Sequence, residues 1–445
     1  MPLETPKNPY LRTTYAVWEL TLKCNLNCIH CGSRAGAKRP RELSTAEAMD
    51  LIHQLADIGI REVSFIGGEA FLRPDWLELA REVKRCGMRL TMVTGGFGMG
   101  PKMTEKMAEI GFAAVSVSID GLRENHDLLR GRDKSYEWCW RAIKAIRGAG
   151  MKASANTQIN RLSAPQLPLI FQLLRDAGVY SWQLQFTVPM GNAADRPELL
   201  MQPHELLDVY PVLHELWTRS DPGGAPYIFM ANNVGYFGPY ERRFRNFVSS
   251  EEAEQGFWNG STAGILTLGI EADGTIKADP SLPTDDYAGG NIRERSLKEI
   301  VFGSERLTFN DDFDPSRLWG FCRSCEFAEL CRGGDTWTSH VFFDRLGNNP
   351  YCHHRALHHA ARGLHERVRL RERASGQPFD NGVFETSVVP ASRLTGERGA
   401  FHLEDVKWPR AWLEQEPGLT RRLAAERDRS IDAWRATRLG WSASA

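Results

Sequence analysis

Seven of the nine cysteines fall into two tight groups, and the first group contains three of them. It reads Cys24-Asn-Leu-Asn-Cys28-Ile-His-Cys31 and directly follows a strand-like segment. Three thiolates at this spacing can each bind one iron of a [4Fe–4S] cluster, which leaves the fourth iron without a protein ligand. The alternative is a zinc ion that takes His30 as its fourth ligand. The spacing favours the cluster but leaves both open.

The second group is Cys322-x2-Cys325-x5-Cys331 followed by Cys352. Four thiolates from one loop region make a closed, all-cysteine site, and both zinc and a [4Fe–4S] cluster accept such a ligand set.

The remaining two cysteines, Cys86 and Cys139, lie alone in helical stretches. We expect them to be small buried apolar residues.

Alternating strand and helix patterns over residues 15–220 must position the first group. Short segments rich in β-branched and aromatic residues predict strands at 16–23, 62–66, 89–94, 113–119, 152–159 and 182–188. Helices lie between them; one opens with the capping box Ser44-Thr-Ala-Glu47 and ends at Gly59. Six strand–helix units predict an α/β fold, a partial (β/α)6 TIM-like barrel with its chemistry at the carboxyl ends of the strands.

The pattern changes after this region, and the sequence predicts three domains. The partial barrel spans residues 1–222, a small loop-rich α+β domain spans 223–355, and a charged, partly helical extension spans 356–445. A hairpin at 264–277 turns at Asp273-Gly274. In the extension, helices are expected near 356–374 and 417–438.

Composition excludes several classes of protein. The 445 residues carry a formal net charge of −1, which predicts no nucleic-acid partner. No apolar run is long enough to cross a membrane, and the first residues lack a secretory signal pattern. We therefore expect a cytoplasmic protein without a membrane partner.

Three further motifs follow the first cysteines in order along the chain. Gly67-Gly68-Glu69 ends the second strand, and Ser118-Ile-Asp120-Gly121 ends the fourth, with Arg130 beyond it. Together with the Cys-x3-Cys-x2-Cys loop after the first strand, this arrangement resembles the radical S-adenosylmethionine (SAM) superfamily.

The resemblance implies that Cys24, Cys28 and Cys31 hold a [4Fe–4S] cluster whose open iron is chelated by SAM. A flavodoxin- or ferredoxin-like reductant would drive SAM cleavage to a 5′-deoxyadenosyl radical that abstracts hydrogen. The Gly-Gly-Glu motif would hold the methionyl amino group, and the serine and arginine the methionyl carboxylate and ribose region. The predicted cofactor-binding residues are His30, Gly67, Gly68, Glu69, Thr94, Ser118, Asp120 and Arg130. One departure is Thr94-Gly95-Gly96, where the family often has Thr-Asn-Gly.

The second cysteine group resembles the SPASM/twitch-type domain of peptide-modifying radical enzymes. The resemblance implies that Cys322, Cys325, Cys331 and Cys352 hold one auxiliary [4Fe–4S] cluster. A further auxiliary cluster is not expected, because non-cysteine residues stand where its ligands would be. These are Ser261, Asp279 and Asp335.

Because enzymes with this domain mostly modify ribosomally made peptides, the leading interpretation is a peptide maturase that crosslinks, epimerises or excises backbone. Its partner would be a precursor peptide. The short segment before Cys24 implies a separate leader-recognition protein, or a leader-binding role for the extension. An aromatic bridge at 225–260 could line the peptide groove through Asn232, Asn233, Tyr236 and Tyr240.

Two alternatives remain open at this stage. A tetrapyrrole side-chain enzyme would need basic residues around its cavity, for which Arg242, Arg243 and Arg245 are candidates. A non-catalytic zinc or Fe–S binding module is the other alternative, against which Gly67-Gly68-Glu69 and Ser118 argue. No general acid or base is identified by the sequence.

Overall fold

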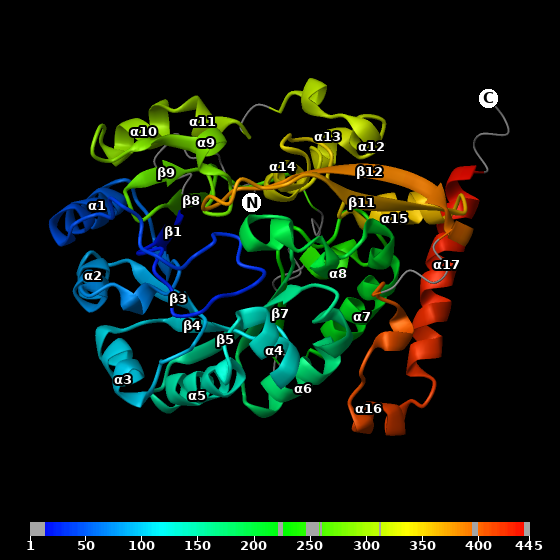
Figure 1. The fold of residues 1–445 in the computed structure, drawn as a ribbon, viewed down its shortest axis with the longest axis horizontal. Helices are drawn as coiled ribbons and strands as arrows, with labels where there is room; N and C mark the ends of the chain where they lie inside the picture. Colours follow the sequence, from blue (N-terminus) through cyan, green and yellow to red (C-terminus); the bar gives the residue numbers. More distant parts are fainter. Residues whose placement is uncertain are drawn as a thin grey trace, which may run out of the picture.

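The computed structural model describes residues 14–220, 226–245, 258, 260–310, 313–393 and 399–439 (Figure 1). The expected domain boundary at residue 222 and part of the aromatic bridge lie outside these ranges. Within them, no helix is both long and apolar enough to cross a membrane.

The core of the fold is a curved sheet whose first seven strands run parallel in the order β1 to β7. The strands are β1 (Tyr15–Glu19), β2 (Glu62–Ile66), β3 (Arg89–Thr94), β4 (Ala114–Ser118), β5 (Lys152–Ile159), β6 (Ser181–Phe186) and β7 (Tyr227–Met230). The first six confirm the predicted strands, although β1 ends four residues early. The seventh lies in a stretch expected to be loop, because four residues are too few to show alternation.

Helices cover the outer side of this sheet, as Figure 1 shows. They are α1 (Thr45–Asp57), α2 (Trp76–Arg85), α3 (Pro101–Ile110), α4 (Arg123–Arg130), α5 (Ser135–Gly148), α6 (Leu167–Asp176) and α7 (Leu206–Arg219). The capping box forms as expected: the Glu47 backbone N–H donates to the Ser44 hydroxyl, and the Glu47 carboxylate accepts from the Ser44 N–H at 2.8 Å. The predicted α/β class is confirmed, and within the described residues the sheet does not close into a barrel.

Side-chain alternation separates the two faces of the sheet. In β5, Ala153, Ala155, Thr157 and Ile159 are buried, whereas the residues between them are partly exposed. The same alternation holds in β6. Because successive side chains of a strand point to opposite faces, the partly exposed set faces the inside of the curve.

The sheet continues beyond β1 through the predicted hairpin. β8 (Thr267–Ile270) pairs parallel with β1 and antiparallel with β9 (Thr275–Lys277), and β10 (Ala288–Asn291) completes the edge. One short helix, α8 (Glu241–Arg245), precedes the hairpin. Six more short helices come after β9: α9 (Thr284–Tyr287), α10 (Leu297–Gly303), α11 (Glu305–Thr308), α12 (Gly320–Arg323), α13 (Ala328–Cys331) and α14 (Thr336–Phe343).

The C-terminal extension corrects one expectation. The helix expected near 356–374 is wrong: α15 (His353–Ala360) ends before Gly363, whose φ of 67° does not continue a right-handed helix. β11 (Leu364–Glu372) then pairs antiparallel with β12 (Val383–Pro390). The later helix is confirmed as α17 (Leu419–Leu439), which follows α16 (Arg410–Gln415) and packs on α7 (Figure 1).

A buried ionic cluster joins the hairpin to the first strand. The Arg39 guanidinium contacts Glu19 at 2.6 Å and Glu271 at 3.1 Å, and the Lys277 ammonium lies 2.9 Å from Glu271. Lys277 is fully buried and also donates to the Leu282 carbonyl at 2.6 Å. Since buried charges require partners, the cluster fixes β8 and β9 against β1.

Replacing Lys277 with methionine should therefore destabilise the protein. The change leaves the Glu271 carboxylate buried with one cation fewer, an effect of about 3 kcal/mol. We expect the thermal unfolding midpoint of the cluster-loaded protein to fall by several degrees. The matched Lys106→Met change, on the exposed face of α3, should leave it unchanged. Equal midpoints for the two variants would contradict the assignment.

Candidate functional site

The three cysteines of the first group lie in the loop after β1, at the edge of the sheet where β2, β3 and β4 also end. A cavity of about 260 Å³ opens there. Its lining includes all three cysteines and most of the predicted cofactor-binding residues: His30, Gly67, Gly68, Thr94, Ser118 and Arg130. Glu69 and Asp120 lie behind this lining.

The spacing of the three sulfur atoms fits a cluster better than one zinc ion. The thiols are near enough to interact electrostatically with one another. Yet among the described residues, no set of three ligand atoms within 4.8 Å of one another includes them. A tetrahedral zinc ion would hold its sulfur ligands about 3.8 Å apart. In a cubane cluster each thiolate binds a different iron, so the wider spacing suits the cluster.

The loop keeps at least two of its cysteines in the neutral thiol form. Burial raises the pKa of Cys24 to about 11 and that of Cys28 to about 12, although nearby Arg130 lowers the Cys28 value. Both are therefore thiols near neutral pH until a metal binds and displaces the protons. Backbone N–H groups of Leu26 and Ala35 lie 3.4 Å from the sulfurs of Cys24 and Cys31. Such N–H contacts help set the potential of a cluster.

A buried polar chain links the cysteine loop to the end of β4. His30 Nε2 lies 2.9 Å from Asp120 Oδ2, and the Arg130 guanidinium contacts the same carboxylate and lies 3.7 Å from Cys28 Sγ. Burial alone would raise the pKa of Asp120, but Arg130 and His30 hold it well below its usual range. Arg130 Nε is buried without a partner in the described chain. That remaining donor fits the predicted contact with a methionyl carboxylate.

The Gly-Gly-Glu motif performs two different structural tasks. A Cβ on Gly67 would lie 2.2 Å from the Thr21 carbonyl oxygen, and one on Gly68 2.3 Å from that of Lys23. The glycines thus let β2 approach the cysteine loop, and Gly68 N–H donates to Thr21 O at 2.8 Å. Glu69 is only 1% exposed, and burial raises its pKa to about 7.

The Glu69 carboxylate has partners on the neighbouring strand. It accepts from the Thr94 hydroxyl at 2.7 Å and from the Gly95 N–H at 3.0 Å. Its oxygens therefore hold the ends of β2 and β3 together. The predicted contact between this carboxylate and the methionyl ammonium stays a prediction, and the backbone of Gly67 and Gly68 is what faces the cavity.

Sequence reasoning missed three amide side chains in the cavity lining: Asn156, Gln158 and Gln185. They occupy the partly exposed positions of β5 and β6 and so point into the curve of the sheet. Asn156 donates to the Ser118 hydroxyl at 3.1 Å. The alternation of small or apolar residues with amides was the sequence signal that could have found them.

A second missed feature is the short turn that follows β6. Asn192 donates from its side chain to the Cys28 carbonyl and from its backbone to the Cys31 carbonyl, both at 2.8 Å. A Cβ on Gly191 would lie 2.4 Å from the Cys31 carbonyl oxygen. The cysteine loop is therefore held from both sides, by the end of β2 and by this turn.

The second cysteine group also converges. Cys322 and Cys331 lie in α12 and α13, and Cys352 directly precedes α15. The thiols interact electrostatically with one another, and burial raises the pKa of Cys322 to about 11. As in the first group, no ligand set within 4.8 Å contains them among the described residues. Trp258 covers the group and donates to the Cys331 carbonyl at 3.0 Å.

Three non-cysteine residues stand where a further auxiliary cluster would have its ligands, and the structure shows other contacts for them. The Asp335 carboxylate caps α14 by accepting from the Thr338 N–H at 3.0 Å and its hydroxyl at 2.9 Å. Asp279 accepts from the Ser281 N–H at 2.9 Å. Ser261 lines a separate cavity of about 40 Å³. The expectation of a single auxiliary cluster stays a prediction.

The described residues of the aromatic bridge do not contribute to the lining of the 260 Å³ cavity. Asn233 pairs with the backbone of Phe186, Tyr236 is fully buried, and Tyr240 stacks on His353. Asn232 is exposed, and none of the four predicted residues lines the 260 Å³ cavity. Tyr236 and Tyr240 are buried in the protein core instead.

The candidate propionate-binding arginines also lie away from this cavity. Arg245 contacts Glu241 at 3.1 Å, Arg243 contacts His214 at 2.9 Å, and Arg242 is exposed. Of the two lone cysteines, Cys139 is buried as expected, whereas Cys86 is only partly buried.

Known proteins share this architecture. Residues 18–160 match the Radical SAM superfamily model. The AdoMet-dependent heme synthase of Methanosarcina barkeri (strain Fusaro / DSM 804) is 29% identical over 350 residues, which cover 76% of this chain and 95% of that protein. The mycofactocin maturase MftC of Mycolicibacterium smegmatis is 29% identical over 343 residues, covering 75% and 81%.

Among solved structures, Streptococcus suis SuiB bound to precursor peptide SuiA aligns with a TM-score of 0.60. The alignment covers 77% of this chain and 76% of that one at 15% identity, which shows a shared fold. The fold and the three-cysteine loop thus define an enzyme of the radical SAM class. Residues 18–160 of this chain thus match a radical SAM domain, and that family implies SAM and a [4Fe–4S] cluster as cofactors.

The close approach at Gly68 yields a direct test. Gly68→Ala should displace the cysteine loop, because its Cβ would meet the Lys23 carbonyl oxygen. We expect loss of about half of the bound iron and of SAM cleavage. Gly148→Ala, where a Cβ meets no atom within 4 Å, should retain both. Full iron content in Gly68→Ala would show that the loop does not need this contact.

Proposed function

We propose that this radical SAM enzyme abstracts hydrogen from a precursor peptide, as in peptide maturation by crosslinking, epimerisation or backbone excision. The observation that carries the proposal is the neutral, amide-rich wall of the 260 Å³ cavity. When bound, SAM on the first cluster supplies a 5′-deoxyadenosyl radical, and the chain's own residues orient the substrate beside it.

The amides on β5 and β6 match the chemistry of a peptide backbone. Within the described chain, the side-chain amides of Gln158 and Gln185 form no hydrogen bond. Each offers both a donor and an acceptor, as a peptide group does. They line the same cavity as the three cysteines, so a peptide bound to them would lie beside the cluster.

Charge supports the same substrate class. Arg130 is the one lysine or arginine in the described lining of the cavity, and its guanidinium is already paired with Asp120. A substrate with several carboxylates would require additional cations, because charged acceptors bind best to charged donors.

The second cysteine group is proposed to hold one auxiliary [4Fe–4S] cluster. Four thiols converge at a spacing wider than a single zinc ion requires, and the group is largely buried. A cluster with four protein ligands has no open iron for substrate, so its role is electron relay or structural support. A flavodoxin- or ferredoxin-like reductant would supply the electron. A separate leader-recognition protein could present the peptide.

A tetrapyrrole side-chain reaction is the second candidate. It is favoured by the relative from M. barkeri, which is named a heme synthase and is aligned over 95% of its length. The scarcity of cations in the cavity lining argues against it.

Iron counting tests the two cluster assignments. Two [4Fe–4S] clusters require about eight irons per chain. We expect that value for the anaerobically reconstituted protein, and about half of it when Cys24, Cys28 and Cys31 are replaced by alanine. Replacing Cys322, Cys325 and Cys331 should also remove about half.

The matched control for iron counting is Cys139→Ala, which changes a buried thiol outside both groups and should leave the iron content unchanged. About twelve irons in the unaltered protein would contradict the single auxiliary cluster. Zinc in place of iron would contradict both assignments.

Release of 5′-deoxyadenosine tests the substrate class. A peptide encoded beside the gene should accelerate release several-fold above the rate without substrate, and iron-coproporphyrin should not. Gln185→Leu should raise the KM for the peptide about tenfold, the loss expected for one or two hydrogen bonds. Gln172→Leu, on α6 and outside the cavity lining, should leave the KM unchanged. Acceleration by the porphyrin alone would favour the second candidate.

A further inference from the structure

A group of three potential metal ligands lies outside both cysteine groups. It consists of His340 on α14, Asp344 at the end of that helix, and Asp286 on α9. The imidazole Nε2 lies 3.4 Å from Asp286 Oδ2 and 3.3 Å from Asp344 Oδ1. His340 is only 5% exposed, whereas the two aspartate side chains are 57% and 60% exposed. The group is therefore a buried imidazole facing two carboxylates at the surface.

The imidazole nitrogen that faces the carboxylates has no hydrogen-bond partner among the described residues. Two oxygens are close, but neither meets the geometry of a hydrogen bond to it. The other nitrogen, Nδ1, lies 3.1 Å from the Tyr287 hydroxyl. Burial lowers the pKa of His340, whereas Asp286 and Asp344 act in the opposite direction. In the tautomer in which Nδ1 donates to the Tyr287 hydroxyl, the Nε2 lone pair is directed between the two carboxylates.

The distances correspond to the edges of a metal coordination polyhedron. Hydrogen bonds between nitrogen and oxygen are usually about 2.7–3.2 Å long. A tetrahedral zinc ion with bonds of about 2.1 Å holds a nitrogen and an oxygen ligand about 3.4 Å apart. A metal ion bound to Nε2 lies along the direction of the Nε2 lone pair, and the two carboxylate oxygens then lie to the side of that direction. This explains why both oxygens are near and neither is hydrogen-bonded.

We propose that His340, Asp286 and Asp344 bind a divalent zinc ion, with water in the remaining position. The exposed carboxylates give the ion a path from solvent, and Tyr287 orients the imidazole in the way that outer-sphere groups do at zinc sites. The ion would crosslink α9, which precedes Cys322, to α14, which follows Cys331. It would brace the region in which a further auxiliary cluster is not expected.

The backbone places Asp344 for this role. Its N–H donates to the His340 carbonyl, and its φ of 52° turns the chain out of α14 so that its carboxylate returns toward the imidazole. The Asn381 amide lies 3.4 Å from the same Asp344 oxygen and is the other polar neighbour of that atom. Asparagine also accepts a left-handed backbone, so Asp344→Asn removes charge without backbone strain.

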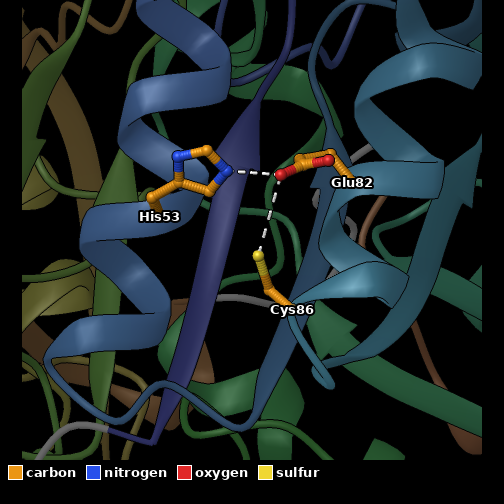
Figure 2. Close-up of side chains that lie close together, drawn as sticks. All are labelled: His53, Glu82 and Cys86. Carbon is orange, nitrogen blue, oxygen red and sulfur yellow. Dashed lines mark hydrogen bonds and ion pairs between the residues drawn. The ribbon is translucent and has the colours of Figure 1, made fainter.

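A second group of three ligands shows the contrast. His53 on α1 and Cys86, the residue after α2, both face the carboxylate of Glu82 on α2, as Figure 2 shows. There the Arg85 guanidinium already binds both carboxylate oxygens. A metal ion would have to displace that cation, and in the described chain none of these three side chains has a buried polar atom without a partner. We therefore assign no metal to it.

The test uses the anaerobic, cluster-loaded full chain with zinc ion as the probe. After equilibrium dialysis against micromolar zinc, elemental analysis should find one zinc retained per chain. Zinc-edge X-ray absorption should report nitrogen and oxygen ligands. Asp286→Asn and Asp344→Asn should each weaken binding at least tenfold, while their iron content and circular dichroism stay unchanged.

The matched control is Asp285→Asn, which neutralises the exposed neighbour of Asp286 and should bind zinc like the unaltered chain. Zinc should also raise the thermal unfolding midpoint of these two proteins and not of the Asp286 and Asp344 variants. Equal zinc binding in all four proteins, or sulfur ligation of the zinc, would overturn the proposal.

Discussion

The site depends on one steric constraint, the contact between the backbone of the cysteine loop and the end of β2. Thr21 and Lys23 present carbonyl oxygens to Gly68 and Glu69 N–H groups at 2.8 Å. Any side chain at Gly67 or Gly68 would occupy the space of those oxygens. The loop can therefore continue the edge of the sheet, with its sulfur atoms turned toward the cavity. The other components of the site are arranged around this contact.

A buried group of charged and polar side chains also holds the cysteine loop in place. Asp120 is fully buried and remains charged because Arg130 and His30 surround it. The same guanidinium reaches Cys28, so one cation connects the sheet edge, the loop and the sulfur ligand. On the opposite side, Asn192 binds the carbonyls of the loop. The cysteine loop is thereby held by polar contacts on two of its sides.

The sequence could predict those features that depend on local pattern. The six strands and their helices, the capping box at Ser44 and the hairpin turning at Asp273-Gly274 follow from periodicity and turn residues, and all are present. Each cysteine group converges because its members are close in the chain or flank short helices. The order of the glycine and acidic motifs along the strands brought the cofactor-binding candidates to one edge.

Features set by tertiary packing escaped the sequence. Asn192 is 164 residues from Cys28, and nothing local marks it as a loop partner. The strand at 227–230 is too short to show a period, and Gly363 converted an expected helix into a helix and a strand. Tyr236 and its aromatic neighbours resembled a binding surface, but they fill a core around Trp258 and Cys331. The amides of β5 and β6 do alternate with buried residues in the sequence, but the structure shows which face of the sheet lines the cavity.

The central claim is that the first cluster keeps an iron free for SAM. The most direct measurement is electron–nuclear double resonance on the reduced protein in which Cys322, Cys325 and Cys331 are alanine, so that one cluster remains. With SAM labelled at its methionyl nitrogen and carboxylate, the account predicts magnetic coupling from both labels to the cluster. A cluster signal that is unchanged by SAM, with no coupling from either label, would contradict it.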